Sequence, residues 1–300
     1  MLDIDRIRRV RAEQPGVIHE ALATRRRRPL LGQDGRLFIV AADHPARGAL
    51  GVGRRAVAMA SRIDLLERLA VALGRPGVDG VLGTPDVIED LALLGVLEDK
   101  VVVGSMNRGG LQGSSFEFDD RVTAYDVPSM TRDGVDMGKL LLRIALDDPA
   151  TSSTLEAVAS AVTTASRAAL PIMLEPFMSG WHDGRVRNDL SIEAVVKSVS
   201  IASGLGGSSA YTWLKLPVVP QMERIAEATT LPVLLLGGDP VTGADETFAA
   251  WQHGLSLPGV RGLVVGRTLL YPEDDDVIAA VDIAAGLVHA GSSNGVRATP

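Results

Sequence analysis

Amine chemistry is the first possibility that this sequence raises, because lysine is scarce in it. Of its 30 basic residues only four are lysines, and the other 26 are arginines. Since arginine serves as the general surface cation, a lysine kept in an apolar segment is a candidate for chemistry that a guanidinium cannot perform. Lys139 (GKLLLRI) and Lys215 (YTWLKLP) stand in such segments.

Lys215 lies at the end of its segment, and Pro217 ends the expected strand two residues later. Partial burial there would lower the pKa of the amine and leave a nucleophile able to form a Schiff base. We interpret Lys215 as catalytic, the alternative being a structural lysine in an ion pair or at the surface. Lys139 would assist it or bind a substrate oxygen, although pairing with Asp136 or another carboxylate explains Lys139 equally well.

Carboxylates end two further apolar segments. Glu175 (IMLEPF) would pair with a lysine or transfer protons, unless it turns outward to cap a helix. Asp43 and His44 (AADHP) follow another segment, where an aspartate is also a common turn residue.

Glycines follow the last two apolar segments. Gly237 and Gly238 end LLLGGDP, and Gly266 and Arg267 stand in LVVGRT. Glycine lets backbone N–H groups approach an anion and Arg267 would add a charge, so we expect a phosphate site there. Glycines also end strands for purely steric reasons, which is the alternative.

The candidate residues can form one site only if the fold brings the ends of their apolar segments together. Eight short apolar segments read as strands buried on both faces. They are Leu37–Ala42, Asp79–Leu82, Val101–Gly104, Lys139–Ile144, Pro171–Pro176, Tyr211–Lys215, Pro232–Leu236 and Gly262–Val265. Amphipathic helical patterns lie between them, at Arg55–Leu73, Thr151–Ala169, Ser191–Ser203, Asp245–His253 and Asp276–His289.

This alternation predicts an α/β fold, a (β/α)8 TIM barrel with its site at the carboxyl ends of the strands. A doubly wound sheet would need a glycine fingerprint after its first strand, and none follows Ala42. We expect one domain over residues 1–290, with an N-terminal helical extension over 1–30 and a disordered tail over 291–300. The Arg25–Arg28 run reads as a solvated helix end.

Composition narrows the function. The absence of cysteine excludes disulfides and thiolate chemistry, and five scattered histidines argue against a metal site, so we expect neither metal nor cofactor. A net charge of −7 argues against nucleic-acid binding. No apolar run is long enough to span a membrane and the N-terminus lacks a signal-peptide core, so we expect a cytoplasmic protein.

Together these motifs resemble the class I (Schiff-base) aldolases with a (β/α)8 barrel, of the tagatose-bisphosphate and archaeal-type fructose-bisphosphate kinds. The resemblance spans about residues 36–272. It implies that Lys215 forms the imine, that Glu175 shuttles protons, and that Lys139 and Asp43 are polar partners. It also implies that Gly237, Gly238, Gly266 and Arg267 hold phosphate. We expect His44 to bind the substrate as well, although His44–Pro45 departs from the tagatose type, which has a different polar pair there.

Phe177 departs from the archaeal type, which carries a tyrosine near this position. The chain also resembles a branch associated with inositol breakdown, which suggests 2-deoxy-5-keto-gluconate 6-phosphate or a ketose (bis)phosphate as substrate. We expect a homo-oligomer whose partner is a phosphorylated sugar. Two alternatives remain: a phosphosugar isomerase or epimerase that forms no imine, and a non-catalytic barrel that binds sugar phosphates.

Overall fold

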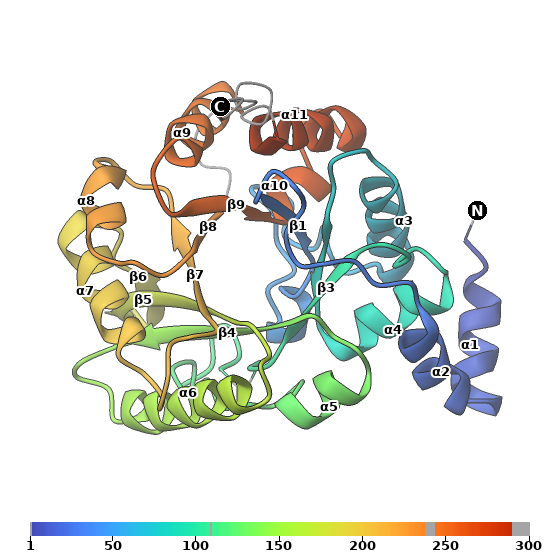
Figure 1. Ribbon diagram of the computed structural model, residues 1–300, viewed down its shortest axis with the longest axis horizontal. Coiled ribbons are helices and arrows are strands. Elements are labelled where there is room, and N and C mark those ends of the chain that lie inside the picture. Colours follow the sequence, from blue (N-terminus) through green and yellow to red (C-terminus); the bar gives the residue numbers. More distant parts are fainter. Residues whose placement is uncertain (1, 109, 238–243, 290–300) are drawn as a thin grey trace, which may run out of the picture.

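The computed structural model describes residues 2–108, 110–237 and 244–289, and the expected tail at 291–300 lies outside them. Eight parallel strands form a closed barrel, because β1 pairs with both β2 and β9 and β4 pairs with both β3 and β5. Figure 1 looks along this barrel. The predicted TIM barrel is confirmed, and the open sheet is excluded. The parallel strands are β1 (Leu37–Ala41), β2 (Gly80–Gly83), β3 (Val101–Ser105), β4 (Met137–Ile144), β5 (Ile172–His182), β7 (Thr212–Pro217), β8 (Val233–Leu236) and β9 (Val260–Val265).

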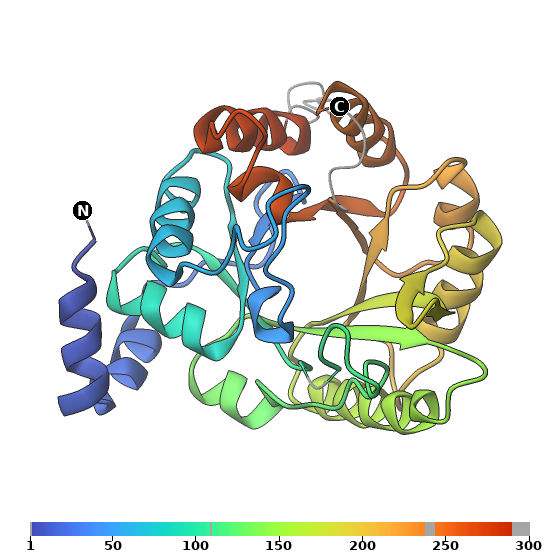
Figure 2. The same cartoon turned by 180° about the vertical axis from the view of Figure 1, so that it is seen from behind.

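Helices cover the outside of the barrel (Figures 1 and 2). The N-terminal pair, α1 (Ile4–Glu13) and α2 (Gly16–Thr24), lies outside this layer, where α2 contacts α4. The others are η1 (Pro45–Arg47), α3 (Arg62–Leu73), α4 (Pro85–Leu93), α5 (Val127–Arg132), α6 (Ala150–Arg167), α7 (Ile192–Ser203), α8 (Met222–Glu227), α9 (Ala244–Leu255), α10 (Arg267–Leu270) and α11 (Val277–His289). In the part of the chain that the structure describes, no helix combines the length and apolarity that a membrane crossing requires.

The helix predicted from Arg55 begins later than expected. Ser61 caps α3 by accepting a hydrogen bond from the backbone N–H of Asp64 (3.2 Å). Arg55 instead forms an isolated bridge with Val52, and Val57 is exposed rather than packed against the barrel. The local cap therefore sets the start of this helix.

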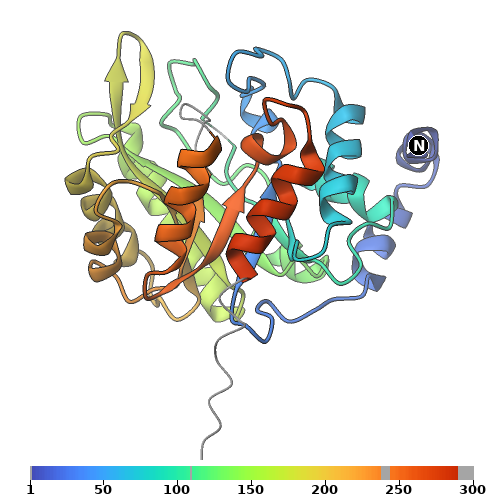
Figure 3. The ribbon, with the colours of Figure 1, turned by 90° about the horizontal axis from the view of Figure 1, so that it is seen from above.

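The fifth predicted strand is longer than expected. β5 continues through Pro176 to His182 and then turns back as β6 (Arg185–Asn188), the antiparallel partner of its last residues. Figure 3 shows this hairpin projecting beyond the barrel. Its inner side carries Val186 and Asn188 into the wall of the cavity described below.

Inward-facing side chains follow the two-residue period of the strands. Apolar residues such as Met137, Met173 and Trp213 fill the barrel interior. Two residues further along the same strands, the inward positions become polar: Lys139, Glu175 and Lys215. The strand pattern thus places these three groups in one layer, next to the apolar side chains that fill the barrel interior.

The interpretation of Arg25–Arg28 as a solvated helix end was wrong for Arg25 and Arg28, whereas the side chains of Arg26 and Arg27 are 69% and 52% exposed. Arg25 is buried and pairs with Asp136 (2.7 Å), which also binds Arg27 and accepts a hydrogen bond from the backbone N–H of Val102. Arg28 pairs with Asp79. The run therefore fastens the N-terminal extension to the amino ends of the strands, where buried aspartates need partners.

Candidate active site

A cavity of about 910 Å³ opens at the carboxyl ends of the barrel strands. Its wall includes most of the residues that the sequence singled out. These are His44, Lys139, Glu175, Phe177, Lys215, Gly237, Gly266 and Arg267. Gly238, the other predicted phosphate-site glycine, lies outside the described residues.

Glu175 is held between the two lysines. Its Oε1 lies 2.7 Å from Nζ of Lys215, and its Oε2 lies 2.5 Å from Nζ of Lys139. All three residues are buried, with Lys215 4% exposed and Lys139 2% exposed. Glu175 therefore pairs with lysines rather than capping a helix. Lys139 does pair with carboxylates, but they are Glu175 and Asp43 and not Asp136.

Asp43 extends this network across the barrel. Its Oδ2 accepts hydrogen bonds from Lys139 (3.3 Å), from the Ser105 hydroxyl (3.2 Å) and from the Arg108 guanidinium. Arg108 also donates from Nε to the Ser105 hydroxyl (2.8 Å). Asp43 is thus part of a buried charged network and not a simple turn residue.

The electrostatics keep both carboxyl groups ionised. Burial alone would raise the pKa of Glu175, but Lys139 and then Lys215 lower it to about 2. Burial likewise opposes ionisation of Asp43, yet Arg108 and Lys139 hold its pKa well below the usual range. Burial lowers the pKa of Lys139, against the attraction of the two carboxylates.

His44 is a neutral imidazole at this site. Burial lowers its pKa to about 3, and the positive charges of Arg267 and Lys215 add to that effect. Its Nδ1 lies 3.8 Å from Oδ1 of Asp43, beyond hydrogen-bond distance. A neutral ring at the wall of the cavity can donate or accept one hydrogen bond to a ligand.

The two glycines that the structure describes have steric reasons to be glycine. A Cβ at Gly266 would overlap the carbonyl oxygen of Ala41, and one at Gly237 would overlap the side chain of Val265. Both glycines nevertheless line the cavity, and Arg267 follows at the start of α10.

Sequence reasoning missed several polar residues of the cavity. Arg143 has the same inward register as Lys139, four positions earlier, so strand periodicity would have found it. Arg47, Arg108 and Glu117 lie outside the strands, and only the folded chain places them in the wall. Among the described residues, no group of three or more histidines and acids is arranged to hold a metal ion.

Comparison with known proteins gives a family. Residues 35–285 match the family model described as Cgl0159-like. The chain belongs to the Cgl0159-like family. Its members include Cgl0159 from Corynebacterium glutamicum, whose crystal structure is 64% identical and superposes with a TM-score of 0.94, covering 96% of this chain and 97% of that one.

More distant structures share the barrel. An archaeal fructose 1,6-bisphosphate aldolase is 18% identical with a TM-score of 0.63, over 91% of this chain and 100% of that one. A second archaeal structure, described with its catalytic lysine covalently bound to the carbinolamine intermediate, is 19% identical with a TM-score of 0.63, over 91% and 99%. No curated protein matches the chain. At these identities the aldolase structures show the common fold.

Proposed function

We propose that this member of the Cgl0159-like family is a class I aldolase that cleaves or forms a carbon–carbon bond through an imine on Lys215. The observation that carries the proposal is the Glu175 carboxylate shared by two buried lysines at the mouth of the barrel. An amine, a group able to move its protons and a second cation are the parts that Schiff-base catalysis needs. The archaeal aldolase described with its catalytic lysine bound to a carbinolamine has the same fold and supports this choice.

The reaction begins when the deprotonated amine of Lys215 attacks the ketone carbon of the substrate. The carbonyl oxygen gains a proton, and the carbinolamine then loses water with proton transfer through Glu175. In the free enzyme Oε1 of Glu175 lies 2.7 Å from Nζ of Lys215. Once a base, Glu175 or Asp43, removes the proton of the β-hydroxyl group, the bond between the carbons α and β to the imine breaks, and the protonated imine accepts its electron pair to become an enamine. An aldehyde leaves, and the enamine is protonated and hydrolysed to restore the free lysine.

The substrate in this proposal is a phosphorylated ketose or keto-sugar acid. Gly237, Gly266 and Arg267 would hold its phosphate at the ends of β8 and β9, with the neutral His44 bonded to a neighbouring oxygen. Such an anchor would fix the ketone beside Lys215 and lower the entropic cost of the attack. Candidates include 2-deoxy-5-keto-gluconate 6-phosphate and ketose (bis)phosphates.

Borohydride trapping with intact-mass analysis tests the imine. Incubation with ketose phosphates and keto-sugar acid phosphates, followed by reduction, is expected to add one substrate fragment to the wild-type protein. Lys215→Arg should abolish the adduct, whereas Lys197→Arg, a change at an exposed lysine of α7, should leave it intact. Adduct formation by Lys215→Arg at the wild-type level would refute the assignment.

The same experiment separates the alternatives. An isomerase or epimerase without an imine would exchange a substrate proton with solvent and give no reduced adduct. A non-catalytic barrel would be stabilised by sugar phosphates without turnover or exchange.

A further inference from the structure

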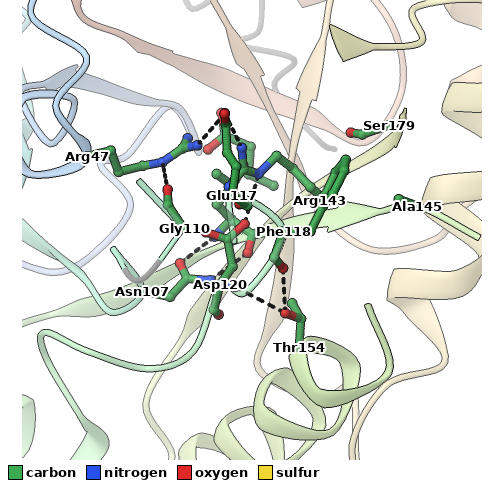
Figure 4. Close-up of polar contacts among 12 residues, drawn as sticks. Arg47, Asn107, Gly110, Glu117, Phe118, Asp120, Arg143, Ala145, Thr154 and Ser179 are labelled. Atoms are coloured by element: carbon green, nitrogen blue, oxygen red, sulfur yellow. Dashed lines mark hydrogen bonds and ion pairs between the residues drawn. The ribbon is translucent and has the colours of Figure 1, made fainter. Parts of the chain in front are cut away.

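A second cluster of charged side chains lies in the wall of the same cavity. Figure 4 shows Arg47 and Arg143 pointing toward Glu117 from opposite sides. Arg143 donates from Nη1 to Oε1 of Glu117 (2.9 Å) and from Nε to Oδ2 of Asp120 (2.9 Å). Arg143 stands on β4, and Glu117 and Asp120 lie in the connection after β3; in the strand order of the barrel, β3 and β4 are the strands farthest from β8 and β9. Arg47 lies in η1, after β1, and its side chain reaches toward this connection, to Gly110 and Glu117. The cluster therefore faces the expected phosphate turns across the mouth.

The segment that carries Glu117 and Asp120 is firmly fixed. Asn107 donates to the carbonyl oxygens of Asp120 (3.1 Å) and Leu141 (2.6 Å), and its own side-chain oxygen accepts from the N–H of Leu141. Thr154 on α6 accepts a hydrogen bond from the N–H of Asp120 (3.1 Å; Figure 4). The acids of this cluster are thus held in place before any ligand arrives.

The two arginines differ in how many of their N–H groups are already hydrogen-bonded. Arg143 is buried and uses its Nε and both terminal nitrogens on Glu117 and Asp120, so its role is to hold the wall. Counting only described residues, the side chain of Arg47 makes one hydrogen bond, from Nε to the Gly110 carbonyl (3.1 Å), and Nη2 lies 3.7 Å from Glu117. Arg47 therefore faces the cavity with most of its N–H groups uncommitted.

The electrostatic environment of Arg47 also indicates that its charge is incompletely compensated. Burial, followed by the nearby charge of Arg143, lowers the pKa of Arg47 to about 10. Glu117 and Asp120 only partly offset these effects. An added anion beside Arg47 would supply the missing compensation.

We propose that Arg47 is the specificity-determining residue that binds a carboxylate at the end of the substrate remote from its phosphate. This rests on the proposed function, in which the phosphate lies at β8 and β9. A ligand that spans the two anion sites crosses the barrel mouth, and β5 and β7, which carry Glu175 and Lys215, form one of the two sides between those sites. Glu117 and Asp120 offset part of the positive charge of Arg47 and Arg143, so the cluster suits one added negative charge better than the two of a phosphate. The planar guanidinium fork also matches a carboxylate.

Binding of ligands that lack a ketone tests this without any imine. Calorimetry compares 6-phosphogluconate, which carries a carboxylate opposite its phosphate, with sorbitol 6-phosphate, which has a hydroxymethyl group there. Wild type is expected to bind 6-phosphogluconate roughly tenfold to a hundredfold more tightly. A hexitol 1,6-bisphosphate forms the third arm and is expected to bind more weakly than 6-phosphogluconate.

Variants locate the preference. Arg47→Met should bring the affinity ratio of the first two ligands close to one, and Arg47→Lys should give an intermediate ratio because the charge remains without the fork. Arg121→Met, which removes an exposed arginine of the same segment, should keep the wild-type ratio. Thermal unfolding of each variant checks that it is folded.

Several results would overturn the inference. They are equal affinities of wild type for the two monophosphates, tighter binding of the bisphosphate, no binding of any of the three, or an unchanged ratio in folded Arg47→Met. None of these results depends on the Lys215 adduct. Failure of borohydride trapping, in contrast, would count against the aldolase and leave the carboxylate preference to be judged by the calorimetry.

Discussion

Replacing Glu175 with glutamine removes the one carboxylate that both active-site lysines share. Glutamine keeps the volume and a hydrogen-bonding oxygen, so the change is mainly one of charge. Lys139 retains Asp43 at 3.3 Å, whereas in the described part of the chain Lys215 has no acidic side chain other than Glu175 within ion-pair distance. The variant therefore leaves a buried ammonium group without its counter-charge.

The size of the effect follows from burial. The Lys215 side chain is 5% exposed and that of Glu175 is 11% exposed, so solvent screens the pair little. Removing one partner of a buried ion pair costs about 3–5 kcal/mol. For a chain of 300 residues this corresponds to a fall in melting temperature of about 5–8 °C.

The deficit should shrink as the pH rises. Burial already lowers the pKa of Lys139, and loss of the Glu175 charge lowers that pKa further. The folded variant then binds fewer protons than its unfolded chain near the folded pKa of Lys139, so its stability increases with pH relative to wild type.

Thermal and urea unfolding at pH 7 and pH 9 measure both effects. The double variant Glu175→Gln/Lys215→Met provides the control, because removing both charges should recover much of the loss. The assignment of Glu175 as the counter-charge of Lys215 is incorrect if Glu175→Gln has the melting temperature of wild type at pH 7. It is also incorrect if the double variant is less stable than the single one.

Two further predictions concern the amino-terminal end of the barrel. His289 contacts Asp79 (3.4 Å) and Asp34 (2.5 Å), and these carboxylates raise the pKa of its imidazole to about 9. Allowing for the partial exposure of the ring, protonated His289 should contribute about 1–2 kcal/mol to the free energy of unfolding. This contribution is complete below pH 6.5 and is lost as the pH rises through 9. His289→Gln should flatten unfolding stability between pH 7 and pH 10, and a wild-type slope in that variant would contradict the assignment. Asp136→Asn should lower the free energy of unfolding in urea by about 2–4 kcal/mol, because buried Arg25 loses its carboxylate partner. A loss below about 0.5 kcal/mol would show that the ion pair between Arg25 and Asp136 is unimportant for stability.

The local chemistry of the chain determined much of this protein. Short apolar segments separated by amphipathic ones predicted all eight barrel strands, because a parallel strand covered on both faces must be apolar along its length. The scarcity of lysine singles out Lys139 and Lys215 without reference to their positions in the fold. Glu175 and Asp43 followed from their places at segment ends, and all four residues meet in one network.

Contacts between distant segments decided the rest. Whether Lys139 would pair with Asp136 or with Glu175 was open in the sequence, since the answer depends on which face of β4 turns inward and on which strand lies beside it. Arg25 became buried because Asp136, more than a hundred residues away, needed a cation. Arg47 and Glu117 meet for the same reason: side chains on separate connections are brought together only when the barrel closes, and no local pattern records that closure.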